Sequence, residues 1–223
     1  QIIAKQRLFT PSNDTITVRA LYSDTEFAIL LEWDDRTRSV PGDKLAVEIS
    51  DANIAEDAVA IQLPIKIPES MEKPYFGMGD VKNPVNIWHW QSGTTETPEE
   101  ISLLNSKGYK KIEKRDAATI GINARGVYHE GTWKVVMKRS LTTSESEKDL
   151  QFVSGKFIPI AFAAWDGSNS EKDSRHTMTT WYWLLLKPAR KNTPLLMALG
   201  IFFIILVAEF WWARSALQKR SSV

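Results

Sequence analysis

Short runs of alternating apolar and polar residues recur along the sequence and constrain its fold more than any other feature. They lie at 16–22, 27–33, 45–50, 58–66, 85–90, 119–128, 132–139, 157–165 and 179–186. Period-two alternation over such lengths, bounded by Gly, Asp, Asn and Ser, is typical of β-strands. The tripeptide His129-Glu130-Gly131 predicts a hairpin turn between two of the runs. Many strands with almost no helix predict an all-β fold, an antiparallel β-sandwich.

One short helix is predicted near Pro98, where PEEISLLN (98–105) places acidic residues in a first helical turn. Loops are expected at 91–117, apart from this helix, and at 142–150. Residues 166–178 form a polar connection between two apolar runs.

Composition excludes several classes of function. The formal net charge is only +1, with 28 Lys and Arg against 27 Asp and Glu, so binding to nucleic acid is not predicted. Cysteine is absent, which excludes disulfides, thiolate metal sites and the C-x-x-C-H attachment of a c-type haem. The usual hydrolase, metalloprotease and nucleotide-binding motifs are also missing from the sequence.

An apolar run at 195–213 (LLMALGIFFIILVAEFWWA) predicts one C-terminal transmembrane helix. Phe210, Trp211 and Trp212 near its end suit the headgroup layer. The sequence starts with Gln1, which predicts a removed signal peptide. We therefore predict a single-pass protein of the cell membrane, with an extracytoplasmic domain (1–190) on the periplasmic or extracellular side. Residues 191–223 would form the anchor and a short cytoplasmic tail.

Two loop segments contain candidate ligands for a metal centre. The first is Gly77-Met78-Gly79, and its thioether is a ligand that haem iron accepts. The second follows Trp165 and leads to His176. Because both segments lie between predicted strands, two sheets could bring Met78 and His176 to one haem. From the residues alone, ordinary packing is the more usual explanation of a loop methionine and of Trp-rich strands.

At these segments the chain resembles the haem-binding γ subunits of ethylbenzene dehydrogenase, dimethylsulfide dehydrogenase and selenate reductase. The resemblance covers much of residues 58–186, in IPESMEKPYFGMGD, NPVNIWHW, VYHEGTWKVVMKR, FIPIAFAAWDGSN and TTWYWLLL. It implies a β-sandwich with one non-covalent haem b that receives electrons from a molybdenum enzyme through an iron–sulfur subunit. The chain is then an electron-transfer subunit of an oxidoreductase complex rather than an enzyme by itself.

The resemblance also implies the axial ligands. The family's ligand methionine in YF-x-MGD falls on Met78. The second ligand of the family is typically a lysine in the polar loop after WDG, but the aligned positions here are Arg175 and His176. Because arginine is too basic to bind iron, His176 is the predicted ligand and Lys172 is the reserve. His89 is predicted to line the pocket or contact a propionate, and is a third ligand candidate.

Four further residues of these segments are predicted to contact the cofactor: Trp88, Lys73, Tyr75 and Trp181. Surrounding aromatic side chains would give the haem a low-dielectric pocket. Lys73, together with Lys82, would pair with the haem propionates; the alternative is that both are solvated surface lysines.

In having a predicted anchor, the chain resembles related subunits of membrane-bound nitrite oxidoreductases and of some archaeal respiratory complexes. Expected partners are the iron–sulfur and molybdopterin subunits of an oxidoreductase, or a Rieske/cytochrome b assembly, together with membrane or cytochrome carriers. Two alternatives without haem remain: a carbohydrate-binding-like module with exposed Trp side chains, and a structural subunit that only anchors a larger enzyme.

Overall fold

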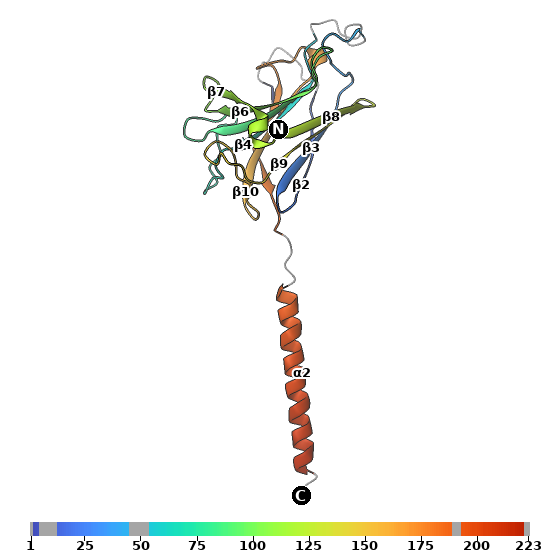
Figure 1. The fold of residues 1–223 in the computed structure, drawn as a ribbon, viewed down its shortest axis with the longest axis vertical. Coiled ribbons are helices and arrows are strands. Elements are labelled where there is room, and N and C mark those ends of the chain that lie inside the picture. The colour runs from blue at the N-terminus through green and yellow to red at the C-terminus, as the bar shows by residue number, and fades with distance from the viewer. Residues whose placement is uncertain (1, 5–12, 45–53, 189–192, 221–223) are drawn as a thin grey trace. The chain divides into compact units, whose positions relative to one another are not determined.

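A computed structural model describes residues 2–4, 13–44, 54–188 and 193–220 (Figure 1). The chain divides into two units, residues 1–186 and residues 187–223. The predicted domain boundary at residue 190, and the predicted strand at 45–50, lie outside the described residues.

Twelve strands of the first unit are described. They are β1 (Ile2–Ala4), β2 (Thr17–Tyr22), β3 (Glu26–Asp34), β4 (Ala58–Pro64), β5 (Val85–Gln91), β6 (Glu100–Ser106), β7 (Ile112–Arg115), β8 (Asn123–His129), β9 (Thr132–Ser140), β10 (Phe157–Trp165), β11 (Thr177–Thr179) and β12 (Tyr182–Leu185). Two 3-10 helices are η1 (Ala117–Ile120) and η2 (Gly167–Asn169).

The strands form two sheets whose pairings are all antiparallel in the described residues (Figure 1). The larger sheet has eight strands in the order β1-β11-β10-β4-β5-β6-β7, with β12 paired to β10. The smaller sheet has the order β2-β3-β9-β8. The predicted antiparallel β-sandwich is therefore confirmed, and the predicted hairpin turn at 129–131 joins β8 to β9.

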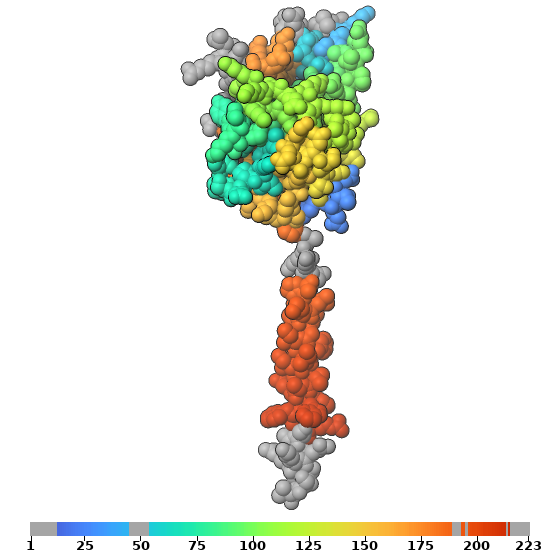
Figure 2. All heavy atoms as spheres, turned by 60° about the vertical axis from the view of Figure 1, so that its left-hand side comes forward, coloured from blue at the N-terminus to red at the C-terminus, as the bar shows by residue number. Residues whose placement is uncertain are grey.

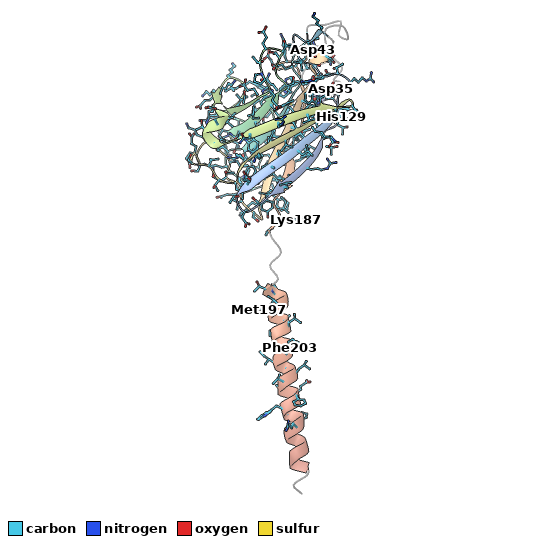
Figure 3. The ribbon with its side chains drawn as sticks, turned by 45° about the vertical axis from the view of Figure 1, so that its right-hand side comes forward. Asp35, Asp43, His129, Lys187, Met197 and Phe203 are labelled. Atoms are coloured by element: carbon cyan, nitrogen blue, oxygen red, sulfur yellow. The ribbon has the colours of Figure 1, made fainter. Side chains whose placement is uncertain are left out.

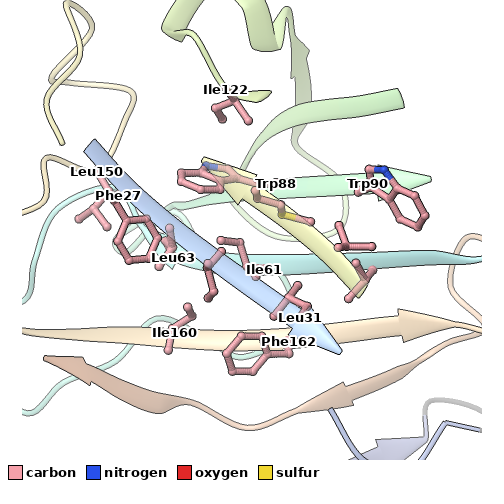
Figure 4. Packing of buried hydrophobic residues seen from close by; sticks show 14 of the residues in the cluster. Phe27, Leu31, Ile61, Leu63, Trp88, Trp90, Ile122, Leu150, Ile160 and Phe162 are labelled. Carbon is pink, nitrogen blue, oxygen red and sulfur yellow. The ribbon is translucent and has the colours of Figure 1, made fainter. Parts of the chain in front are cut away.

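The core lies between the two sheets. In β3 and β9 every second side chain is buried, as the alternation predicts for strands with one face inward. Figure 4 shows Phe27 and Leu31 of β3 among Ile61, Trp88 and other side chains of the larger sheet. The indoles add ring contacts, such as Trp90 against Trp133 with ring centroids 5.1 Å apart.

Strand β4 is buried on both faces, unlike the strands of the smaller sheet. Val59, Ile61 and Leu63 belong to the core between the sheets. The alternate residues Ala58, Ala60 and Gln62 face the other side of the larger sheet and are buried as well. A second layer of structure therefore covers the outer face of this sheet.

The helix predicted at 98–105 is wrong, because this segment forms β6. β6 pairs with β5 on one side and β7 on the other. Its neighbours in the sheet decide its conformation, although the acidic residues after Pro98 favour a helix start locally. The loop expected across 91–117 is interrupted by β6, β7 and the start of η1 for the same reason.

Residues 142–150 form a connection without strands that is held against the larger sheet. Arg115 of β7 binds Asp149 with Nη1–Oδ1 at 2.7 Å and Glu145 with Nη2–Oε2 at 2.7 Å. Figure 2 shows this gold-coloured segment lying beside the green and teal parts of the surface. The buried charge of Asp149 is therefore paired, as burial of a carboxylate requires.

The second unit contains α2 (Thr193–Arg220). The predicted span 195–213 falls within this helix. The side chains of residues 195 and 213, at the two ends of the span, lie outside the described part of the chain. Within the described part of the chain, no helix combines the length and the apolarity that crossing a membrane requires. Met197 and Phe203, labelled in Figure 3, are exposed. The transmembrane helix stays a prediction.

Gly126 of β8 gives a direct test of the packing between the sheets. A Cβ at this position would lie 2.1 Å from Cζ2 of the buried Trp90. We expect Gly126→Ala to lower the free energy of unfolding by about 1–3 kcal/mol, because overpacking forces side chains off their rotamers. Urea denaturation of the protein measures this, with Val127→Ala, which alters an exposed side chain of the same strand, as the control. Equal stability of Gly126→Ala and the wild type would contradict this packing.

Candidate functional site

A cavity of about 670 Å³ lies over the outer face of the larger sheet. Its volume falls in the range of cofactor and small-molecule sites, roughly 300–1,000 Å³. Strands β4, β5 and β10 form its floor, and residues of the segments 73–80, 104–112 and 171–178 form its walls. Most of its lining is apolar, including Phe76, Ile87, Leu104, Phe162 and Met178.

Small side chains give the floor its depth. Ala60 pairs with Ala163 of β10 and with His89 of β5, so these three residues form one row across the sheet. Ala58 and Ala161 lie in the neighbouring rows and also line the cavity. Because methyl groups extend so little from the backbone, the sheet leaves open space where larger side chains would fill it.

Met78 lies in a strained turn at the edge of the cavity. Its φ is +71°, a left-handed conformation that costs a residue with a side chain on the order of 1 kcal/mol. The flanking Gly79 also has a positive φ, +70°, and a Cβ there would lie 2.9 Å from the carbonyl oxygen of Asn83. Such strain persists only where the surroundings enforce it, and it is concentrated at functional sites.

Hydrogen bonds hold this turn in place. The Gly79 amide donates to the Tyr75 carbonyl at 2.8 Å, and the Gly108 amide donates to the Met78 carbonyl at 3.0 Å. The Gln62 side chain donates from the cavity floor to the Phe76 carbonyl at 3.1 Å. The turn is therefore fixed to both β4 and the β6–β7 connection, and the position of Met78 is fixed with it.

His176 comes from the segment that follows β10. Asp166 starts this segment by accepting hydrogen bonds from the Ser168 and Asn169 amides. The His176 side chain is buried, and its Nδ1 lies 2.9 Å from the Asp173 carbonyl oxygen. A carbonyl can only accept, so Nδ1 carries the proton and the ring's lone pair is on Nε2. Such a bond orients a histidine that binds metal.

Trp165 lies between two imidazoles. Its ring centroid is 4.9 Å from that of His89 and 4.7 Å from that of His176. Burial lowers the pKa of His89 to about 4, with smaller contributions from the charges of His176 and Lys114. His89 is therefore neutral at pH 7, and a neutral imidazole can bind a metal or accept a hydrogen bond.

The structure brings four of the predicted site residues together. Met78, His89, His176 and Lys172 all line the cavity, although they come from three separate parts of the sequence. Lys172 is exposed, whereas His176 is buried. The predicted site residues did not include Trp165 or the four alanines of β4 and β10, here called the alanine row (Ala58, Ala60, Ala161 and Ala163), which complete the floor. The sequence does contain a signal for the alanines. In β4 and in β10 they occur two residues apart, so they lie on the same face of each strand.

Trp88 does not line the cavity, and its predicted cofactor contact is not supported by its position. Adjacent residues of a strand point to opposite faces, so Trp88 faces away from the side that His89 occupies. Its ring packs in the core between the sheets, 6.3 Å from Phe27, and its Nε1 donates to Asn86 at 2.9 Å.

The other three predicted contacts lie around the cavity rather than on its lining. The Trp181 Nε1 donates to the Pro74 carbonyl at 2.7 Å and so supports the turn of Met78. Lys73 Nζ lies 4.7 Å from the ring centroid of Trp183, and Tyr75 is exposed. Lys82, the other lysine predicted to pair with a propionate, binds Glu72 at 2.9 Å.

The possible donors of the cavity include two thioethers, two imidazoles and one amine, together with carboxylates, between largely apolar walls. Thioether and imidazole are axial ligands that haem iron accepts, and apolar walls suit a porphyrin ring. The residues present therefore fit a haem.

Comparison with known sequences gives a match over most of the chain. A family described as ethylbenzene dehydrogenase matches residues 4–111 and 102–177. These two matches include every candidate ligand, from Met78 to His176.

Two curated relatives are each 28% identical to the chain. One, from Haloferax mediterranei, is assigned as a respiratory nitrate reductase heme subunit (ORF7); the match spans 186 residues, 82% of this chain and 60% of the relative. The other is the chlorate reductase subunit gamma of Ideonella dechloratans, matched over 177 residues, 79% of this chain and 66% of the relative. The chain thus spans less than two thirds of the length of either relative.

Solved structures give a more distant likeness. A protein from Bacteroides uniformis, assigned as carbohydrate-binding, has a TM-score of 0.45 and 8% identity over 85% of this chain and 80% of its own. A family 9 carbohydrate binding module from Caldicellulosiruptor kristjanssonii, in complex with glucose, has a TM-score of 0.45 and 10% identity over 83% and 82%.

The low pKa of His89 predicts how stability depends on pH. Between pH 6.5 and about 4 the unfolded chain binds a proton at this residue and the folded chain does not. The free energy of unfolding of the ligand-free protein should therefore fall as the pH is lowered through this range, by up to about 3 kcal/mol. Urea denaturation at several pH values measures the effect.

We expect His89→Gln to remove most of this pH dependence. His129→Gln, which changes an exposed residue of the β8–β9 turn, is the control and should leave it unchanged. Parallel pH profiles for the wild type and His89→Gln would show that His89 is not the group responsible.

Proposed function

We propose that this chain, which belongs to the ethylbenzene dehydrogenase family, binds one non-covalent haem b in the cavity beside Met78 and His176. In this proposal it serves as an electron-transfer subunit of a respiratory oxidoreductase complex. The observation that carries the proposal is the convergence of Met78 and two imidazoles on a mostly apolar cavity of about 670 Å³.

Met78 and His176 are the proposed axial ligands. Met78 is held rigidly by its strained, hydrogen-bonded turn, and a methionine ligand raises the reduction potential of a haem. His176 is buried, and its Nδ1–H bond to the Asp173 carbonyl directs the Nε2 lone pair away from that carbonyl. Lys172 is the reserve ligand because it lines the same cavity but is exposed. His89 is the third candidate and otherwise contacts the ring from the floor.

A haem with two protein ligands supplies one-electron transfer, since it has no open position for a substrate. The protein residues keep water from the ring: Phe76 and Leu104 form apolar walls, Ile87 lies in the floor, and the small alanines of β4 and β10 let the ring lie close to the sheet. Trp165, in contact with both imidazoles, keeps their orientation.

The partners are part of the proposal. The names of the two relatives support a place in a reductase complex. We propose iron–sulfur and molybdopterin subunits as its neighbours there. Electrons would pass between that catalytic part and a membrane or cytochrome carrier. The proposal also assigns 195–213 as a membrane anchor; the support is the uninterrupted apolar sequence from Leu195 to Ala208 and the exposed apolar side chains described on α2.

The haem prediction can be tested with matched pairs of variants. We expect the wild-type protein to give a haem b pyridine spectrum and low-spin bands in the reduced-minus-oxidised spectrum. Met78→Leu should disturb these bands and lower the reduction potential, because the sulfur ligand is lost. Met178→Leu, which changes another methionine of the cavity lining, should do neither.

His176→Gln should weaken haem binding by at least the roughly 10- to 100-fold that outer partners of metal ligands contribute. His129→Gln is its control. Normal bands in His176→Gln together with altered bands in a Lys172→Ala variant would move the second ligand to Lys172. A folded, colourless wild type after expression with ample haem would refute the proposal and favour a binding module or a structural subunit.

The anchor prediction is tested by removing residues 191–223. We expect the full chain to stay with the membrane fraction after alkaline carbonate washing and to need detergent for release. The shortened chain should appear in the soluble fraction and retain its haem. Release of the full chain by carbonate would contradict the anchor and leave the haem proposal untouched.

A further inference from the structure

A second group of polar residues lies at one end of the sandwich, outside the cavity lining. Asp35 directly follows β3, Asp57 directly precedes β4, and Asp166 directly follows β10. Among the described residues, these form a cluster in which one oxygen of each carboxyl group lies within 4.8 Å of the other two. Figure 3 shows Asp35 at the same end of the first unit as the His129 turn.

All three carboxyl groups are buried, with Asp57 at 0%, Asp166 at 4% and Asp35 at 5% exposure. The described ion pairs include none of them. Buried carboxylates without a positive partner are strongly disfavoured. A proton or a cation must therefore compensate the cluster.

Asp57 and Asp166 accept hydrogen bonds from several N–H donors. Asp57 accepts from the Ser39 amide at 2.7 Å, from Trp133 Nε1 at 3.0 Å and from the Gly167 amide at 2.9 Å. Asp166 accepts from the Ser168 amide at 2.8 Å. Donors of this kind favour the ionised form and fix where the carboxylates point.

Asp35 provides the second, independent observation. Its Oδ1 accepts from the Thr37 amide at 3.0 Å, but its buried Oδ2 has no hydrogen-bond partner in the described residues. The Trp33 indole N–H, which also lacks a well-formed hydrogen bond, is the nearby donor. A buried carboxylate oxygen without a well-formed hydrogen bond requires a proton or a ligand. Oxygens at about 2.4 Å from one calcium ion lie at most about 4.8 Å apart, and the three carboxylate oxygens satisfy this limit.

We propose that Asp35, Asp57 and Asp166 bind one divalent cation of the calcium type, which ties together the chain ends of β3, β4 and β10. Hard cations prefer oxygen ligands of this kind, and three carboxylates around Ca²⁺ leave one net negative charge. The ion would also fix the start of the segment that leads to His176, because Asp166 starts η2. The proposal stands independently of haem binding.

The test uses the purified full chain in mild detergent. We expect elemental analysis to find one calcium per chain, and EDTA to lower the Tm, with recovery on adding Ca²⁺. Terbium provides a local probe: because Trp133 donates to Asp57, excitation of tryptophan should sensitise Tb³⁺ luminescence, and Ca²⁺ should quench it.

Asp35→Asn keeps the side-chain volume and should weaken Ca²⁺ and Tb³⁺ binding at least about tenfold. Asp34→Asn, which changes the exposed neighbouring residue, is the matched control and should bind both ions normally. If Asp35→Asn does not fold, binding to the wild type decides the question.

Absence of stoichiometric calcium and of Tb³⁺ binding in a folded wild type would overturn the proposal. A metal-free Asp35→Asn protein that is more stable than the wild type at neutral pH would show instead that the cluster shares a proton. Haem content is measured in the same samples, so a failure of the cation proposal is separated from a failure of the proposed function.

Discussion

Burial of the larger sheet on both faces is the constraint on which the rest of the structure depends. A sheet in a two-layer sandwich needs only one covered face, and the smaller sheet follows this rule. β4 is buried at all seven positions because its second face lies under the segments that contain Met78 and His176. Loops therefore cover this cavity, whereas the buried central strands of the larger sheet form its floor. Sites built on strands hold their groups more precisely than sites built on loops alone.

The two loops over this floor are held in different ways. The turn of Met78 is fixed by backbone strain, glycine neighbours and hydrogen bonds to β4 and to the β6–β7 connection. The segment of His176 is fixed at its start by Asp166 and at its end by β11, where Thr177 pairs with Ala164 of β10. Each candidate ligand is therefore positioned by contacts that do not involve the other. A preformed arrangement of this kind lowers the entropy lost when a cofactor binds.

The sequence predicts the strands that alternate clearly, and misses those whose conformation depends on distant partners. β6 was assigned as helix because Pro98 and two acidic residues favour a helix start locally, while pairing with β5 and β7 is decided by the sheet. Met78 and His176 become candidate ligands through the family resemblance, because the residues alone are explained as well or better by packing. Trp88 was misplaced although alternation alone separates it from His89. The three aspartates carry no sequence signal, because they come together only when the ends of β3, β4 and β10 meet.

Trp88 and His89 point to opposite faces of the sheet. Which side chains line the cavity therefore depends on the register of β5, that is, on which of its residues face outward. In β5 the indoles of Trp88 and Trp90 fill the core, and His89 between them lines the cavity. Insertion or deletion of a single residue before this strand, if the pairing with β4 shifted to accommodate it, would exchange the two faces. It would place two indoles where the alanine row leaves space, and an imidazole among Phe27 and Phe152. Length variation in relatives of this chain should therefore be confined to the connections, while the strands of the floor change only by substitution.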